Sequence, residues 1–456
     1  MYKLMGLVLF VCGAGCQAWA DAAVPLSPAQ PRIQQIVRDI SADNIERSIR
    51  KLASFGTRHT ASETESDTRG IGAARRWIKQ QLDACSAANG GRLQVEFDEF
   101  VQQPMARIRQ PLKIVNVVAT LPGRQAESKD RVYVVSGHYD SMCGDVMDEK
   151  CDAPGANDDA SGTAAVMEIA CVMAKHEFDA TLVFMAVAGE EQGLLGATHW
   201  ADMAHKDKRN IAGMFTNDII GSSRADDGRI DKSQVRVFAE GVPAASEMAD
   251  DLRKRIATGG ENDSPTRQLA RFIKESAESY VAGMKVALVY RRDRYLRGGD
   301  HMPFLERGFP AVRFSEINED YRHQHQNARM ENNVQFGDLP EFVDFDYTAN
   351  VARINAAALA ALALGPAMPA KVEIETIRLE NDTTLRWQAN VEPDLAGYEI
   401  LWRDTTAPFW QGRQSVGNVT RHTVKGRSKD NYIFGVRAID KDGNAGVASY
   451  PLPYRP

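Results

Sequence analysis

The fold is indicated most clearly between residues 131 and 204, where apolar strand-like runs alternate with helical ones. These runs read RVYVVSGHYD (131–140), AVMEIACVMA (165–174), TLVFMAVA (181–188) and GLLGATHWADMA (193–204). Nearly continuous apolar strands that alternate with helices are typical of a sheet buried on both faces. We therefore predict an α/β fold with a mostly parallel or mixed sheet, covered by helices on both faces.

The same alternation continues on either side of this stretch. Helices show apolar residues at a spacing near 3.6, and strands show short apolar runs bounded by turn residues. The further elements we expect are helices near 41–52, 66–84, 244–257, 266–283 and 347–364, and strands at 93–101, 112–121, 212–220, 235–240, 285–290 and 310–316. The α/β domain is thus predicted to span 21–365.

The sequence changes character after residue 365. Gly, Pro, Ala, Met and Pro occupy 365–369, which is typical of a linker, and short strand-like runs separated by turn residues follow. Trp387 and the alternating residues 432–436 are suited to the core of a small sandwich. We predict an all-β sandwich over 369–456, which resembles a fibronectin type III domain.

Composition narrows the functional classes. The chain has 456 residues, of which 43% are hydrophobic and 25% are charged, and its formal net charge is −6. These values are typical of a soluble globular protein with a large core and more than one domain. Because the charge is mild and no dense Lys/Arg block occurs, binding to nucleic acid is not favoured.

The N-terminus predicts export. Lys3 precedes the apolar run 4–16, and a small-x-small ending follows at 18–20. This pattern indicates a signal peptide over 1–20, cleaved after Ala20, with a secreted or periplasmic mature protein. A transmembrane anchor and lipid modification of Cys16 are the alternatives, but the run is short for a bilayer span. No other segment is apolar enough for stable membrane insertion.

Four cysteines remain in the mature chain. Cys143 and Cys151 flank a polar loop, and we predict that they form a disulfide in an oxidising compartment. Cys85 and Cys171 lie in apolar helical patterns, where buried thiols are an adequate explanation. The oxidation state of this second pair stays open.

Acidic and imidazole side chains gather where strands end or helices begin, the edge at which α/β sheets build their sites. The five segments are VVSGHYDS (134–141), PGANDDASGTAAV (154–166), FMAVAGEEQGLLG (184–196), MFTNDIIG (214–221) and DYRHQHQN (320–327). Each has a plainer explanation on its own. Asp158 and Asp159, for example, are also suited to capping a helix, and His323 and His325 to a solvated surface.

Taken together, the segments predict a metal centre. Two His, two Asp and two Glu among their side chains form a set that zinc accepts readily: His138, Asp158, Glu190, Glu191, Asp218 and one His of the last segment. Six such groups exceed one tetrahedral ion, so two ions bridged by one carboxylate is the simplest arrangement. Asp140 lies two residues after His138 in an extended run and is expected to orient its ring. The chain shows neither a Gly-rich phosphate loop nor a G-x-S-x-G motif.

These motifs, over roughly 35–365, resemble the di-zinc aminopeptidases of bacterial secretions, whose clan includes glutamate carboxypeptidase and glutaminyl cyclase. The resemblance rests on the segments His138-x-Asp140, Gly155-Ala-Asn-Asp-Asp-Ala-Ser-Gly162, Glu190-Glu191-x-Gly193-Leu-Leu-Gly196, Asn217-Asp218 and a late His. It implies a zinc exopeptidase fold with two zinc ions per chain. Peptides with a free N-terminus are the implied substrates.

The resemblance also implies individual roles. Asp158 would bridge the two ions, and the Asp158–Asp159 peptide is expected to be cis, as in relatives of this kind. The remaining roles are His138 and Asp218 at one ion, Glu191 and His323 at the other, Glu190 as general base and Asp140 as the partner of His138. The reaction is hydrolysis of the N-terminal peptide bond by a metal-bridging water. A glutaminyl cyclase or carboxypeptidase is the alternative, and a non-catalytic binding protein a remote one.

The last histidine motif departs from the family pattern. Relatives show Tyr-His-x-x-x-Asp, whereas Arg322 precedes His323 here, and Asn327 stands four residues after it. Aligning Asn327 with that Asp selects His323 over His325 as the ligand. The segment 299–304 matches another family feature and supports the pocket without supplying ligands. The charged segment 291–295 is interpreted as a solvated loop, with a pocket wall as the alternative.

Overall fold

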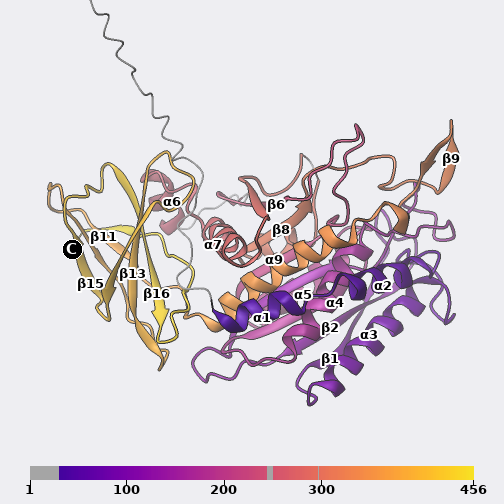
Figure 1. Cartoon of the computed structure of the whole chain (residues 1–456), viewed down its shortest axis with the longest axis horizontal. Coiled ribbons are helices and arrows are strands. Elements are labelled where there is room, and N and C mark those ends of the chain that lie inside the picture. The colour runs from indigo at the N-terminus through magenta and orange to yellow at the C-terminus, as the bar shows by residue number, and fades with distance from the viewer. Residues whose placement is uncertain (1–29, 244–249, 296, 456) are drawn as a thin grey trace, which may run out of the picture.

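The computed structural model describes residues 30–243, 250–295 and 297–455, and its centre is an eight-stranded mixed sheet (Figure 1). The predicted signal peptide lies outside the described residues. The strands are β1 (Gln94–Gln102), β2 (Leu112–Leu121), β3 (Arg131–His138), β4 (Thr181–Val187), β5 (Asn210–Asn217), β6 (Gln234–Ala239), β7 (Lys285–Val289) and β8 (Ala311–Glu316). Their spatial order is β1-β2-β4-β3-β5-β8-β6-β7.

The middle of this sheet is parallel. β3 pairs in parallel with β4 on one side and β5 on the other, and β5 pairs in parallel with β8. β1, β2 and β6 form antiparallel pairs nearer the edges. Because β3, β4 and β5 run the same way, their carboxyl ends meet at one edge of the sheet.

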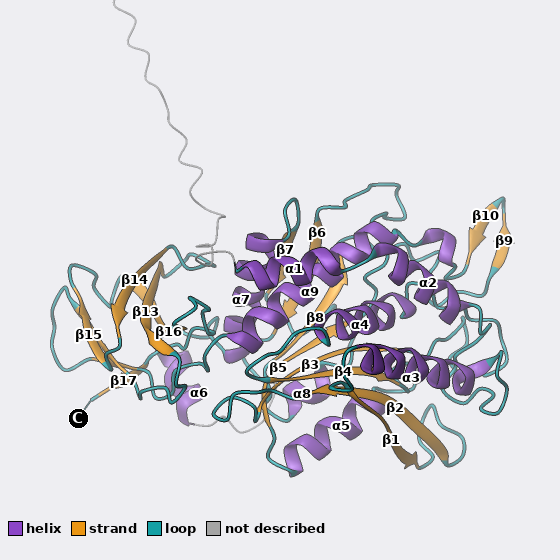
Figure 2. Cartoon of the chain, turned by 60° about the horizontal axis from the view of Figure 1, so that its bottom comes forward, coloured by secondary structure: helices purple, strands orange, loops and turns teal. Residues whose placement is uncertain are grey.

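Helices cover both faces of the sheet (Figure 2). Adjacent residues of β3 point to opposite faces, so Val135 joins one core cluster and Val134 another. The helices of the first cluster are α1 (Pro31–Asp39), α2 (Ala42–Ala53), α3 (Gly70–Ala88), α4 (Ala160–Met173), α7 (Pro265–Tyr280) and α9 (Phe345–Leu364); those of the second are α5 (Leu195–Lys206) and α8 (Met302–Glu306). The predicted α/β fold class is confirmed.

The helix signals in the sequence act as expected. Ser41 caps α2 by accepting a hydrogen bond from the Asn44 amide, and the buried face of this helix includes Ile45, Ile49 and Leu52. A side-chain cap of this kind satisfies an amide that the helix itself leaves unpaired. Within the described ranges, no helix has both the length and the apolar character needed to cross a membrane.

The C-terminal part forms two further sheets, one of four strands in the order β15-β12-β11-β17 and one of three in the order β14-β13-β16. Their bounds are β11 (Glu373–Glu375), β12 (Thr383–Arg386), β13 (Leu395–Asp404), β14 (Gly412–Gly417), β15 (Arg421–Val424), β16 (Tyr432–Asp440) and β17 (Leu452–Tyr454). Trp387 and Val436 are buried in a shared core, as predicted, and Tyr398 is buried with them. We call these seven strands the β unit.

Buried ion pairs join the β unit to the α/β part. The Arg437 guanidinium, whose side chain is 2% exposed, lies 3.0 Å from Glu275 of α7 and 2.8 Å from Glu399 of β13. Arg403 pairs with Asp263 at 2.7 Å. Because breaking a buried pair leaves an uncompensated charge, these contacts hold the two parts in one arrangement. The short helix α6 (Asp250–Ala257) also lies beside the β unit (Figure 1).

Both cysteine pairs are disulfides. Cys143 and Cys151 are bonded, as predicted from the flanked polar loop. Cys85 of α3 is bonded to Cys171 of α4, although buried thiols were an adequate explanation in the sequence. The two helices pack on the same face of the sheet, which brings these cysteines within 5.3 Å of each other between Cα atoms. That proximity depends on helix packing, so helical periodicity alone does not reveal it.

Candidate metal centre

Five of the predicted site residues meet at the carboxyl edge of the parallel strands. His138 is the last residue of β3, Glu190 and Glu191 follow β4, and Asp218 follows β5. Asp158 lies just before α4, which begins at the same edge. Parallel pairing of β3 with β4 and β5 therefore converts positions far apart in sequence into neighbours.

Asp158 belongs to two ligand-type groups, one on each of its carboxylate oxygens. Asp158 Oδ1 lies 3.1 Å from His138 Nε2, which is 4.0 Å from Asp218 Oδ1. Asp158 Oδ2 lies 2.9 Å from His325 Nε2, which is 3.3 Å from Glu191 Oε1. In each group the three ligand atoms lie within 4.8 Å of one another. A carboxylate shared in this way is suited to bridging two cations.

The chemistry of the two groups fits zinc. His138 Nε2 and Glu191 Oε1 are buried and form no hydrogen bond with the described residues. Buried polar atoms without partners are costly, and metal coordination removes that cost. Imidazole nitrogen with carboxylate oxygen is a donor set that zinc binds well. Burial alone would lower the pKa of His138, but Asp159, Asp140 and Asp158 outweigh it and raise that pKa well above its usual value.

His325, and not His323, completes the second group. The predicted residue His323 turns away: its ring stacks on Phe342 with centroids 3.7 Å apart, and its Nδ1 lies 3.8 Å from Asp320 Oδ2. The chain at 321–325 is a turn, and His325 has a φ of +50°, so the two histidines face different directions. The sequence distance between His323 and Asn327 does not reveal this turn, because it carries no information about backbone φ.

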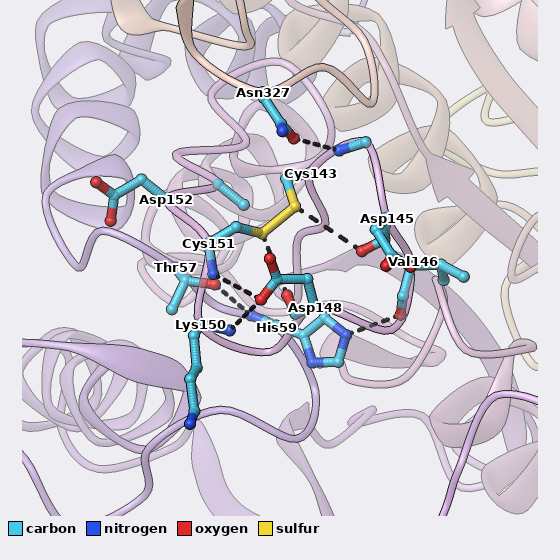
Figure 3. Close-up of a disulfide and its surroundings, with 12 residues drawn as sticks. Thr57, His59, Cys143, Asp145, Val146, Asp148, Lys150, Cys151, Asp152 and Asn327 are labelled. Carbon is cyan, nitrogen blue, oxygen red and sulfur yellow. Dashed lines mark hydrogen bonds between the residues drawn. A yellow bond between two sulfur atoms is a disulfide. The ribbon is translucent and has the colours of Figure 1, made fainter.

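Asn327 has another contact. Its Oδ1 accepts a hydrogen bond from the Gly144 amide at 2.9 Å. It therefore ties the His325 segment to the disulfide-closed loop 143–151, as Figure 3 shows. The prediction of His323 assumes that Asn327 takes the place of the family's Asp, but Asn327 instead contacts Gly144.

Asp140 supports three members of the site. Its carboxylate oxygens accept hydrogen bonds from the amides of Glu190 and Glu191 at 3.3 and 3.2 Å. Asp140 Oδ1 also lies 3.6 Å from His138 Nδ1, which makes a shorter contact of 3.2 Å with the Asp140 carbonyl oxygen. The Thr60 hydroxyl donates to the same carboxylate at 3.0 Å. The contact with His138 was expected; the two amide contacts follow only from the pairing of β3 with β4.

Glu190 lines the cavity at this edge but belongs to neither ligand group. Burial raises the pKa of its carboxyl well above the ordinary value; Asp218 and Glu191 add to that rise and His138 opposes it. A carboxylate beside two ligand groups, and not part of either, is free to exchange a proton with a bound molecule.

Asp159 fixes the backbone around the ligands. Its carboxylate caps α4 by accepting from the Gly162 amide at 3.0 Å, and it also accepts from the amides of His138 at 3.0 Å and Ile219 at 3.3 Å. The Asp158–Asp159 peptide is cis, as the family resemblance implied. One side chain thereby joins the ends of β3 and β5 to the start of α4.

Arg313 and Asp338 also belong to the site, and sequence reasoning missed them. Arg313 of β8 is fully buried, with Nη2 2.9 Å from Asp218 Oδ1 and Nη1 3.0 Å from Asp293 Oδ2. Asp338 accepts from the Asp158 amide at 2.7 Å. An arginine inside the apolar strand at 310–316 was a usable signal, because a buried cation requires acidic partners. Asp338 carries no comparable pattern.

A cavity of about 680 Å³ opens beside the two groups. Met142, Gly144, Asp145 and Val146 of the loop 143–151 and its flank form one wall. The Cys143–Cys151 bond closes this loop (Figure 3), and His59 Nε2 lies 3.0 Å from the Val146 carbonyl oxygen. The two cysteines lie near Asp148 in a metal-like grouping, but their sulfurs are already bonded to each other.

The chain belongs to peptidase family M28, whose model matches residues 116–342. A probable zinc metalloprotease of Pyrenophora tritici-repentis is 47% identical over 96% of this chain and 91% of its own length. A probable zinc metalloprotease of Leptosphaeria maculans is 49% identical over 93% of this chain and 97% of its own length. These two relatives are fungal, whereas the motifs had suggested bacterial enzymes.

Solved structures share the fold. An aminopeptidase from Aneurinibacillus sp. strain AM-1 aligns with a TM-score of 0.50 at 17% identity, over 72% of this chain and 95% of that one. The LapA aminopeptidase of Legionella pneumophila aligns with a TM-score of 0.50 at 18% identity, over 78% of this chain and 76% of that one. At such identities the likeness establishes the architecture alone.

Proposed function

We propose that the chain is a zinc metallopeptidase that removes residues from the free N-terminus of peptides. The observation that carries this proposal is Asp158, which offers one carboxylate oxygen to each of two imidazole–carboxylate groups. His138 and Asp218 would hold one zinc ion and Glu191 and His325 the other. Membership of family M28 and the zinc metalloprotease names of the relatives support the same reaction class.

Glu190 performs the proton transfers in this proposal. Zinc held by the two groups would supply Lewis-acid chemistry for the attacking water and the scissile carbonyl. Glu190 takes a proton from the attacking water and delivers it to the leaving amine. Through its hydrogen bonds, Asp140 fixes the position of the Glu190 backbone and the orientation of the His138 ring for this step.

The number of zinc ions per chain and the substrate panel test the proposal together. We expect two zinc ions in the purified full chain, release of anilide from aminoacyl-anilides and loss of that activity after chelation. One zinc ion with cyclisation of N-terminal glutamine would instead establish a glutaminyl cyclase. Hydrolysis confined to the C-terminal bond of blocked peptides would establish a carboxypeptidase.

Export and the role of the β unit belong to the same proposal. The signal-like segment 1–20 and two disulfides support a secreted or periplasmic enzyme. We assign residues 21–365 to the peptidase domain and 369–456 to a fibronectin type III-like domain, since the latter forms two sheets around one core. Its buried ion pairs with Glu275 of α7 and with Asp263 support a role in stabilising the peptidase domain.

A further inference from the structure

Arginine side chains line the region next to the metal centre. The cavity beside the two ligand groups is lined by Arg107, Arg294 and Arg297. A second cavity of about 530 Å³ shares Arg294, Arg297, Gln324 and His325 with it, so the two adjoin at these side chains. We call this second space the arginine pocket.

The arginine pocket has an excess of positive charge. Arg236, Arg291, Arg294 and Arg297 line it, and Glu319 is the one carboxylate among its lining residues. Glu319 is already shared, with Oε1 2.6 Å from Arg236 and Oε2 2.8 Å from Arg294. Arg294 also lies 3.6 Å from Asp293, which pairs with Arg313 as well. Arg291 and Arg297 form no ion pair within the described residues, so the pocket keeps an excess of positive charge.

The segment 291–295 is a loop with Arg291 and Tyr295 exposed, as predicted, and it also lines the pocket, which was the alternative. The side chain of Arg294 is only 15% exposed, and the carboxylate that holds it, Glu319, is 4% exposed. Asp293 is buried beneath the same segment, where it pairs with Arg313. Two buried acids, Asp293 and Glu319, therefore hold Arg294 in place before a ligand arrives, which lowers the entropy lost on binding.

We propose that the arginine pocket binds a carboxylate of the substrate, so that the enzyme prefers peptides bearing a negative charge close to the scissile bond. This inference rests on the proposed peptidase function. Guanidinium groups bind carboxylates with paired, charge-assisted hydrogen bonds. Arg291 and Arg297 are exposed and form no ion pair within the described residues, so they are available for such a contact. The carboxylate is either the free C-terminus of a short peptide or an acidic side chain.

Three matched substrates separate these sources: a dipeptide amide without acidic groups, the same dipeptide with a free C-terminus, and a dipeptide amide with Asp as its second residue. All three carry the N-terminal residue that the anilide panel favours. We expect kcat/KM about tenfold higher for at least one carboxylate-bearing substrate than for the neutral amide. Added salt should reduce that ratio, because part of the pocket is open to solvent.

Variants of the two exposed arginines test the assignment. Arg297→Gln and Arg291→Gln should each lower the ratio of carboxylate to neutral kcat/KM, by up to about tenfold. Arg38→Gln, on the exposed surface of α1, is the matched control and should leave the ratio unchanged. Both tested side chains are exposed, so the variants are expected to fold.

Two results would overturn the inference in different ways. Equal kcat/KM for the three substrates, or a preference that both arginine variants retain, would exclude the carboxylate site. The proposed peptidase function would be unaffected by that result. Failure of the zinc-loaded protein to cleave any of the three would overturn the proposed function and this inference with it.

Discussion

His325 Nε2 lies 2.9 Å from Asp158 Oδ2, and this contact completes the second of two ligand groups that share one carboxylate. His325 also lies 3.3 Å from Glu191 Oε1, so it links the segment at 320–327 to the end of β4. The neighbouring His323 packs against Phe342 outside both groups. Two histidines separated by one residue therefore have different environments, and mutation can distinguish them.

We expect His325→Ala to lower the zinc content from two ions per chain towards one and to reduce kcat/KM at least about 100-fold, because it removes a proposed ligand. His323→Ala is the matched control and should keep both ions and most of the activity. Metal analysis and anilide kinetics on the two purified variants measure this. Full zinc loading of His325→Ala would show that another residue supplies the ligand.

Glu190→Gln should retain zinc and lose turnover. The amide keeps the shape of the side chain but cannot accept the proton, and a general base contributes roughly 10²- to 10⁴-fold to the rate. Glu127→Gln, on the exposed surface, is the control. A kcat close to that of the unaltered enzyme, measured at saturating substrate, would exclude Glu190 as the base.

The two disulfides should affect different properties. Replacing both Cys143 and Cys151 with Ala frees the cavity wall, so we expect KM to rise several-fold and stability to fall by about 2 kcal/mol for so short a loop. Replacing Cys85 and Cys171 should cost more stability, roughly 4 kcal/mol, because that bond closes a much longer loop. We expect this second pair to leave KM unchanged, as it joins α3 and α4 away from the cavity.

Thermal unfolding and steady-state kinetics on the two double variants measure these effects. If both double variants raised KM, or if neither did, a specific role for the loop 143–151 in the substrate site would be contradicted.

Asp179 predicts a pH dependence of stability at the junction with the β unit. Burial raises its pKa to about 6, and Asp394 and Asp440 add to that rise. The folded state therefore holds the proton more tightly than the unfolded state, whose Asp pKa is about 3.9. The contribution of Asp179 to the free energy of unfolding is therefore largest below about pH 4. It declines as the pH rises to about 6 and is constant at higher pH.

Asp179→Asn removes this loss. Because the group is half-buried and screened by solvent, we expect a gain of only about 1 kcal/mol in the free energy of unfolding at pH 8 and none near pH 4. Denaturant unfolding at both values measures it, with the exposed Asp130→Asn as control. A gain of the same size at pH 4 and pH 8 would exclude the charge as its cause.

Much of the architecture follows from local sequence patterns. Apolar strands between amphipathic helices predicted the α/β layers, and the Ser41 cap marked the start of α2. Residues at strand ends, such as His138 and Asp218, were identifiable because parallel strands place their carboxyl ends at one edge. These inferences need only the period of a strand or helix and the direction of the chain.

The remaining features depend on contacts between distant segments. The choice of His325 over His323 is decided by a turn with a positive φ, the Cys85–Cys171 bond by the packing of two helices, and the arginine pocket by Glu319. Local sequence determined which side chains stand at the edge of the sheet. The tertiary structure decided which of them meet, because side-chain direction at turns and distances between packed elements are set by the whole fold and not by spacing along the chain.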